Sequence, residues 1–170
     1  MAELKLNHWL EKLEQHHPRS IDLGLERVGA VWRALCTPSP ARRVIAVGGT
    51  NGKGSTVAFA EAGAQALGWR VGAYTSPHLI RYNERIRIAG READDETIIA
   101  AFERIEAARG STTLTYFEFG TLAALLVMAQ ASPALDLALL EVGLGGRLDA
   151  VNVIAADVSV VTTVALDHQE

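Results

Sequence analysis

Residues 43–56 read RVIAVGGTNGKGST, a short apolar run that ends in glycine and continues into a polar, glycine-rich segment. Residues 43–49 predict a buried strand, and residues 55–67 predict a helix that ends at Gly68. Glycines between a strand and a helix let the backbone curl around an anion, and the helix N-terminus adds positive potential. The segment therefore predicts a phosphate-binding loop. Its candidate nucleotide-binding residues are Thr50, Asn51, Gly52, Lys53, Gly54 and Ser55, of which Lys53 would neutralise phosphate charge.

The spacing within this loop differs from that of the common phosphate loop. Three residues rather than four separate Gly48 from Gly52, and a glycine separates Lys53 from Ser55. The alternative is a tight strand-to-helix turn that requires glycine for its backbone alone. Asn-Gly-Lys-Gly-Ser between a strand and a helix meets several requirements of a phosphate site together, and this favours phosphate binding.

Strand and helix patterns alternate on the C-terminal side of this loop. They predict strands at residues 71–76, 85–88, 135–142 and 158–166, and helices from Asp94 or Asp95 to about Ala108 and from Phe117 to Gln130. The last two strands are continuous apolar runs, which indicates buried strands in a parallel sheet with helices on both faces. Residues 85–88 alternate like a short exposed strand. The predicted fold class is therefore α/β, with a mostly parallel sheet.

Helical patterns precede the loop. Leucines at helical spacing predict an amphipathic helix over residues 3–16, which Pro18 ends. Residues 21–35 combine a turn with a second helical pattern, and Pro-Ser-Pro at 38–40 predicts a linker. We therefore divide the chain into an N-terminal helical segment, residues 1–40, and a nucleotide-binding domain that begins at residue 41, on which this segment packs.

The composition is that of an ordinary globular protein. The chain has 170 residues, about one domain, and 49% of them are hydrophobic. A net charge of −4 argues against a nucleic-acid-binding protein with a general basic surface. The single cysteine, Cys36, excludes an internal disulfide. The most apolar helical stretch, 121–131, is too short to span a membrane, and the charged N-terminus does not fit a signal peptide, so we expect a cytoplasmic protein.

Three polar residues stand at the ends of predicted parallel strands, where ligands gather in an open sheet. They are Ser76, Glu141 and His168. An acid that closes a buried apolar run needs a partner, and a Mg²⁺ ion beside the phosphate loop would supply one for Glu141. The alternatives are a capping role for Ser76 and a structural role for His168.

Five sequence segments together resemble the dihydrofolate synthase/folylpolyglutamate synthase family, within the larger group of Mur-type amide ligases. They are GTNGKGS (49–55), SPHLIRYNERI (76–86), YFEFGT (116–121), EVGLGGRLDAVN (141–152) and LDH (166–168). IDLGLERV at 21–28 is similar to the bacterial bifunctional members in particular. The resemblance implies a Mur-ligase-like ATPase domain that contains a P-loop, with residues 41–170 as its N-terminal part. The chain would then be the N-terminal fragment of a longer enzyme.

The resemblance also implies an activity. It is that of an ATP-dependent ligase, which adds L-glutamate to dihydropteroate and to reduced folates through an acyl phosphate. The implied cofactors are ATP and Mg²⁺, and the implied partners are these small molecules, with no nucleic acid and no membrane. Mg²⁺ and Lys53 would offset the repulsion between the γ-phosphate and the acceptor carboxylate. We expect the full-length enzyme to be a monomer, and the chain by itself to be inactive and prone to self-association.

By motif position, the resemblance assigns residues to two further sites. Ser76, Glu141 and His168 match the metal ligands, with the hydroxyl of Ser55, or else of Thr56, near the metal. The pterin-binding residues would be Asp22, Leu23, Gly24, Thr115, Tyr116, Phe117, Glu118, Leu148, Asp149 and Ala150. Phe117 offers a flat face to a pterin ring and Asp149 offers a hydrogen-bond acceptor; their alternatives are core packing and a loop turn. Val151 stands where family members usually have threonine.

Two other functions remain open from the sequence. A Mur-type ligase of cell-wall precursors is disfavoured by YFEFGT and by the SPHL segment. A nucleotide-binding switch or a non-catalytic scaffold is disfavoured by the loop spacing and by the candidate metal ligands. The sequence also lacks the Asn-Lys-x-Asp motif of guanine specificity.

Overall fold

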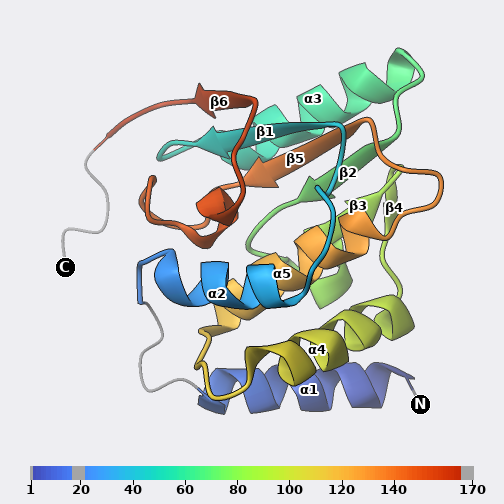
Figure 1. The fold of residues 1–170 in the computed structure, drawn as a ribbon. Helices are drawn as coiled ribbons and strands as arrows, with labels where there is room; N and C mark the ends of the chain where they lie inside the picture. Colours follow the sequence, from blue (N-terminus) through green and yellow to red (C-terminus); the bar gives the residue numbers. More distant parts are fainter. Residues whose placement is uncertain (1, 17–21, 166–170) are drawn as a thin grey trace.

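The computed structural model describes residues 2–16 and 22–165, which form a twisted sheet between helices (Figure 1). The strands of the sheet lie in the order β4-β3-β2-β5-β1-β6. Their bounds are β1 Arg43–Gly48, β2 Val71–Tyr74, β3 Ile86–Ile88, β4 Arg91–Glu92, β5 Leu137–Glu141 and β6 Val158–Val161. Strands β2, β5, β1 and β6 run parallel, whereas β3 and β4 are antiparallel additions next to β2. The predicted mostly parallel α/β sheet is confirmed.

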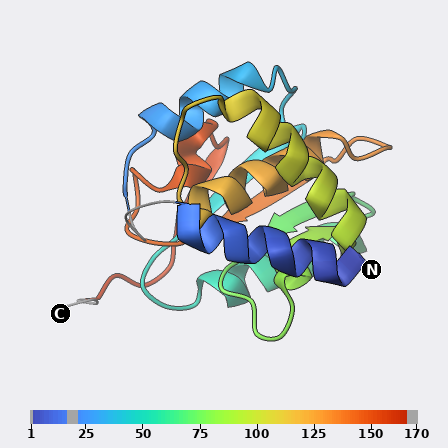
Figure 2. The ribbon, with the colours of Figure 1, turned by 90° about the horizontal axis from the view of Figure 1, so that it is seen from below.

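Helices cover both faces of the sheet, as predicted. Their bounds are α1 Ala2–His16, α2 Glu26–Ala34, α3 Lys53–Ala66, α4 Asp95–Arg109 and α5 Tyr116–Ala129, with short 3-10 helices η1 Tyr82–Arg85 and η2 Ala150–Val153. Helix α3 packs on one face, and α5 and α2 lie on the other, with α4 and α1 beyond them (Figures 1 and 2). The N-terminal helices therefore share the larger core with α4 and α5.

The alternation of side chains along β5 explains the two cores. Leu137 and Leu139 lie in the smaller core under α3, while Ala138 and Leu140 belong to the larger core under α5. Glu141 continues the first series, so its carboxylate points towards the start of α3. This strand alone therefore places a buried acid beside the glycine-rich loop.

For two strands, the predicted burial of the side chains was wrong. The segment 85–88 is not an exposed strand, because β3 pairs with β2 and its Ile86 lies fully buried in the larger core. The predicted buried strand 158–166 is the short strand β6, in which Val158 and Val161 are 50% and 65% exposed. In the described part of the chain, β6 pairs with β1 alone and forms an edge of the sheet; its Val160 packs against the smaller core, while Val158 and Val161 remain in solvent.

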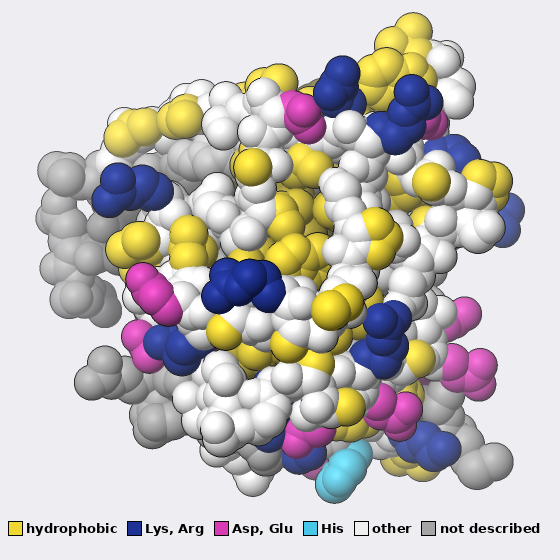
Figure 3. Space-filling view, in the orientation of Figure 1, with side chains coloured by type: hydrophobic (Ala, Val, Ile, Leu, Met, Phe, Trp, Pro, Cys, Tyr) yellow, Lys and Arg dark blue, Asp and Glu magenta, His cyan; other side chains and the backbone are white. Residues whose placement is uncertain are grey.

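The surface view shows where apolar side chains remain visible. They gather in the hollowed middle of the face seen in Figure 3, and charged side chains lie mostly around them. Within the described part of the chain, no helix has both the length and the apolar character that crossing a membrane requires.

Candidate nucleotide and acceptor sites

The glycine-rich loop connects β1 directly to α3. At Gly49 the backbone has φ +130°, and a Cβ there would lie 2.1 Å from the Thr162 hydroxyl oxygen, so only glycine fits. Gly52 caps the helix in the left-handed conformation with φ 84°. Helix α3 therefore begins at Lys53, two residues before the predicted start at 55, because Gly52 can adopt a conformation that other residues resist.

The segment after β6 passes beside this loop and accepts hydrogen bonds from some of its backbone N–H groups. The N–H of Thr50 donates to the carbonyl of Thr163 at 2.7 Å, and the N–H of Asn51 donates to the Thr163 hydroxyl at 3.2 Å. In a helix the first N–H groups have no partner within the helix. The groups left to meet an anion are therefore those at the start of α3, residues 52–55.

Two side chains of the loop are placed differently with respect to such an anion. The Lys53 ammonium donates to the carbonyls of Gly49, at 2.7 Å, and Thr50, at 3.2 Å, so its charge lies over the loop. The Thr56 hydroxyl donates to the carbonyl of Gly52 at 2.8 Å. Ser55 is exposed, and its hydroxyl makes no hydrogen bond with any described residue. Of the two hydroxyls considered for the metal, that of Ser55 is the available one.

Glu141 and Ser76 lie side by side at the end of the loop. The backbone N–H of Ser76 donates to Glu141 Oε2 at 3.1 Å, and both carboxylate oxygens lie near Gly54, 3.7 Å from where its Cβ would be. Burial raises the pKa of Glu141, and the Ser76 N–H, Lys53 and Arg87 oppose this rise. A buried carboxylate with unused lone pairs fits a hard cation such as Mg²⁺.

The third candidate metal ligand, His168, lies outside the described residues. Within those residues, no group of three or more His, Cys, Asp or Glu side chains could hold a metal ion. The structure thus brings together Ser76 and Glu141, beside the loop.

A cavity of about 340 Å³ opens on the other side of Ser76. All ten residues assigned to pterin binding line it: Asp22, Leu23, Gly24, Thr115, Tyr116, Phe117, Glu118, Leu148, Asp149 and Ala150. They come from the turn before α2, the start of α5 and the loop after β5. We call this space the acceptor cavity.

Phe117 forms one wall of the acceptor cavity. Its ring packs on the backbone of Gly143, where a Cβ would lie only 2.4 Å from the ring atom Cζ, and its centroid is 6.1 Å from that of Tyr74. Because Phe117 is only partly buried, the ring remains available to a flat ligand.

Asp149 is almost fully engaged in building the loop after β5. Its carboxylate accepts hydrogen bonds from the backbone N–H groups of Gly143, Leu144 and Val151, at 2.9–3.0 Å, and the residue is 1% exposed. Burial raises its pKa, although these bonds oppose the rise. A carboxylate has about four acceptor positions, so about one is left for a ligand. This geometry supports the loop-turn alternative for Asp149.

Thr115 and Glu118 are also engaged with each other. The Thr115 hydroxyl accepts from the N–H of Glu118, and the Glu118 carboxylate accepts from the N–H of Thr115, which together cap α5. Arg27 of α2 forms ion pairs of 2.9 Å with Glu118 and with Asp22. These contacts tie the three segments of the cavity together.

Comparison with known proteins identifies relatives of this chain in sequence and in structure. No protein-family model matches the chain. The dihydrofolate synthase/folylpolyglutamate synthase of Escherichia coli is 53% identical over 169 residues, which are 99% of this chain and 40% of the relative. Its counterpart in Haemophilus influenzae is 47% identical over 99% of this chain. The structure of E. coli FolC in complex with DHPP and ADP superposes with a TM-score of 0.92 at 53% identity, covering 96% of this chain and 39% of that one.

The chain belongs to the dihydrofolate synthase/folylpolyglutamate synthase family. It spans about 40% of the length of the curated relatives that it matches. The folylpolyglutamate synthase of Thermotoga maritima has the same fold, with a TM-score of 0.88 at 33% identity, covering 98% of this chain and 39% of that one.

In this family member, the acceptor cavity has lining residues that the sequence did not single out. They are Ser76 as a wall residue, Pro77, Arg85, Gly143 and Leu144. Gly143 and Leu144 lie within the EVGLGGRLDAVN segment, so that motif could have pointed to them. Pro77 and Arg85 likewise lie within the SPHLIRYNERI segment, although the alternating pattern at 85–88 predicted a solvent-exposed position for Arg85.

Proposed function

We propose that the full-length protein is an ATP-dependent amide ligase that adds L-glutamate to dihydropteroate and to reduced folates. The observation that carries this proposal is the position of Ser76. It lines the acceptor cavity, and its N–H donates to Glu141 beside the phosphate loop. A carboxylate at this end of the cavity would therefore lie next to the γ-phosphate of a nucleotide bound at α3.

Solved relatives support the same ligands. E. coli FolC was solved in complex with DHPP and ADP. A bifunctional folylpolyglutamate synthase/dihydrofolate synthase, 51% identical to this chain, was solved with Mn, AMPPNP and L-glutamate bound. We therefore assign ATP and a divalent metal, Mg²⁺, as the cofactors of this protein.

The proposed reaction requires two anions, the γ-phosphate of ATP and the carboxylate of the acceptor, to approach each other. The N–H groups of residues 52–55 and the Lys53 ammonium bind the phosphates and stabilise the charge of the transferring phosphoryl group. Ser76, Glu141 and His168 would hold Mg²⁺, which supplies charge neutralisation when it is bound. Transfer of the γ-phosphate to the acceptor carboxylate gives an acyl phosphate. The amino group of L-glutamate then forms the amide bond and phosphate leaves.

We also propose that residues 1–40 act as a segment that docks on the ATP-binding domain, residues 41–170, and that the full-length protein is a monomer. Contacts of α1 and α2 with α4 and α5 support the docking.

The proposed activity is tested with the full-length protein and a panel of acceptors. Dihydropteroate and reduced folates should release phosphate from ATP in the presence of Mg²⁺ and L-glutamate, whereas cell-wall precursors should not. Turnover with a cell-wall precursor and none with a pterin acid would replace the proposal with a Mur-type ligase.

The variant Lys53→Ala tests the phosphate loop in the same assay. Loss of the ammonium should reduce turnover by about 10³-fold or more, because a phosphate clamp contributes several kcal/mol to transition-state stabilisation. Lys5→Ala, which changes an exposed lysine of α1, is the matched control and should keep full turnover. Near-normal turnover of Lys53→Ala would remove this assignment.

A further inference from the structure

Arg85 is a buried cation in the wall of the acceptor cavity. The residue is 8% exposed and lines the cavity together with Ser76, Tyr116 and Phe117. Its Nε donates to His78 Nδ1 at 2.8 Å. Its guanidinium carbon lies 5.3 Å from the ring centroid of Tyr82 and 5.5 Å from that of Tyr116.

No carboxylate neutralises this guanidinium in the described part of the chain. Arg27 and Arg87, by contrast, form ion pairs with Glu118 and Glu61, at 2.9 and 2.8 Å. Burying a charge without a partner is costly, and two tyrosine faces offset only part of that cost. An unpaired cation in a cavity wall is therefore suited to an anionic ligand.

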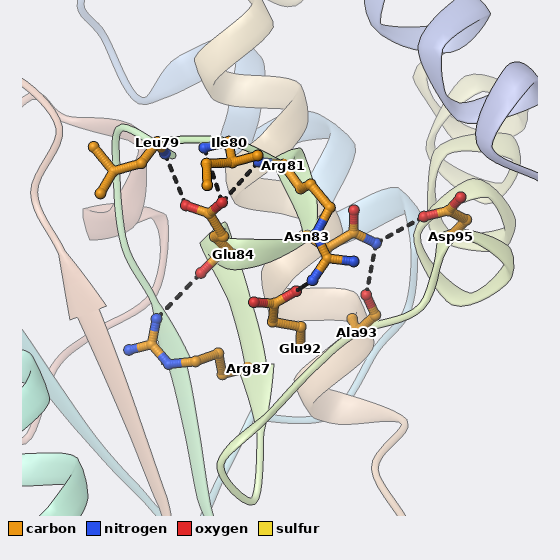
Figure 4. Close-up of polar contacts among 9 residues, drawn as sticks. All are labelled: Leu79, Ile80, Arg81, Asn83, Glu84, Arg87, Glu92, Ala93 and Asp95. Carbon is orange, nitrogen blue, oxygen red and sulfur yellow. Dashed lines mark hydrogen bonds and ion pairs between the residues drawn. The ribbon is translucent and has the colours of Figure 1, made fainter.

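The segment that carries Arg85 is held in a fixed conformation (Figure 4). The Glu84 carboxylate accepts hydrogen bonds from the backbone N–H groups of Leu79, Ile80 and Arg81, at 2.7–2.9 Å. Asn83 donates to the carbonyl of Ala93 at 2.9 Å and to Asp95 at 2.8 Å. These bonds fix the backbone on the N-terminal side of Arg85 before any ligand arrives.

Backbone pairing brings the backbone of Arg85 close to Ser76. The N–H of Thr75 donates to the carbonyl of Arg85 at 2.9 Å, so residue 85 lies across from the residue before Ser76. Ser76 in turn contacts Glu141. Nε donates to His78 and the guanidinium also interacts with the Tyr74 hydroxyl, which leaves the remaining N–H groups of the two Nη atoms to meet a carboxylate.

We propose that Arg85 binds the acceptor's carboxylate and makes the cavity specific for flat heteroaromatic acids over their neutral analogues. This inference rests on the proposed function. In this role Arg85 would hold the reacting carboxylate at the Ser76 end of the cavity until the phosphoryl group is transferred.

The test compares pteroate with its carboxamide, which has the same shape without the charge. Binding of each is measured by calorimetry on the full-length protein without nucleotide and metal. The unchanged protein should prefer the acid by about 10- to 100-fold, as expected for a charge-assisted hydrogen-bonded pair. Arg85→Met should abolish this preference without lowering the melting temperature, because it removes an unpaired buried charge. Arg81→Met is the control and should keep the preference, since Arg81 is exposed and pairs with Glu92.

Each outcome decides between the two proposals. Failure of the unchanged protein to bind either compound would contradict the proposed function itself. Equal binding of acid and amide by the unchanged protein, or a preference that survives in Arg85→Met, would overturn the role of Arg85 alone. Arg85→Gln serves as a second variant if Arg85→Met does not fold. Loss of folding in both would show that the charge supports the fold, and would also overturn the inference.

Discussion

Gly143 shows how one missing side chain shapes the acceptor cavity. Its backbone lies under the Phe117 ring, and a Cβ would come within 2.4 Å of Cζ and 2.5 Å of Cε2. The ring can occupy its place only because residue 143 has no side chain. The motif EVGLGGRLDAVN thus contains a glycine whose purpose lies in packing, in addition to those that shape turns.

We predict that Gly143→Ala displaces the Phe117 ring. The variant should lose about 1–3 kcal/mol of unfolding free energy, the usual cost of overpacking, and should bind pteroate more weakly. Denaturant unfolding and calorimetry on the full-length protein measure the two effects. The control is Gly146→Ala, because a Cβ there meets no atom within 4 Å. Equal effects of the two substitutions would contradict the prediction.

The segment between β2 and β3 is organised by one carboxylate. Hydrogen bonds from the backbone N–H groups of Leu79, Arg81 and Ile80 lower the pKa of Glu84 to about 2, from an ordinary value of 4.5. Leu79 and Ile80 stay exposed, so apolar burial does not hold residues 79–81 in place, although Tyr82 just after them lies in the core. Its order comes from hydrogen bonds to a charged acceptor, which are stronger than those to a neutral one.

We predict that Glu84→Gln loosens this segment, with faster hydrogen exchange at the amides of residues 79–81. The lowered pKa means that the carboxylate stabilises the folded state above pH 4.5, and that this stabilisation is lost as the pH falls towards about 2. The stability difference between parent and variant should therefore shrink over that interval, measured by denaturant unfolding. Glu103→Gln, at an exposed position of α4, should leave exchange unchanged. Identical exchange in Glu84→Gln would refute the role of this carboxylate.

Helix α5 starts at a side chain that the family resemblance assigns to the pterin. The Thr115 hydroxyl accepts from the N–H of Glu118 at 3.1 Å. We predict that Thr115→Ala lowers the unfolding free energy by about 1 kcal/mol, the typical contribution of a helix cap. Thr113→Ala, at an exposed position outside the cap formed by Thr115 and Glu118, is the control for denaturant unfolding. An unchanged stability of Thr115→Ala would leave ligand binding as the role of this hydroxyl.

At the scale of the whole molecule, the sheet has an exposed apolar edge at β6. Exposed valines on an edge strand favour pairing with another chain. We predict that the 170-residue chain self-associates in sedimentation experiments, and that Val161→Lys reduces this association. Leu67→Lys, which changes an exposed leucine just after α3, should have no such effect. A parent chain that stays monomeric at all concentrations would contradict the prediction.

Local patterns predicted most of the elements, and they failed where partners decide burial. Apolar runs identified β1, β2 and β5, and of the two predicted caps for α4, Asp94 or Asp95, the structure shows Asp94. The alternation in residues 85–88 could not reveal that Ile86 faces the core, since a strand's exposure depends on what packs against it. The apolar run at β6 led to the opposite error. It predicted burial, whereas Val158 and Val161 in this edge strand are exposed.

Sequence patterns predicted the α/β fold class and a glycine-rich loop between a strand and a helix, and the family resemblance named segments that line the acceptor cavity. Loop spacing and strand endings are local properties, and a resemblance carried in five short segments needs no coordinates. Contacts in three dimensions are needed to tell which polar groups around the cavity are already engaged. The structure shows Asp149 accepting hydrogen bonds from three backbone N–H groups, whereas Arg85 is buried with no carboxylate partner among residues 2–16 and 22–165. These facts depend on contacts between residues far apart in the chain, and no local pattern encodes them.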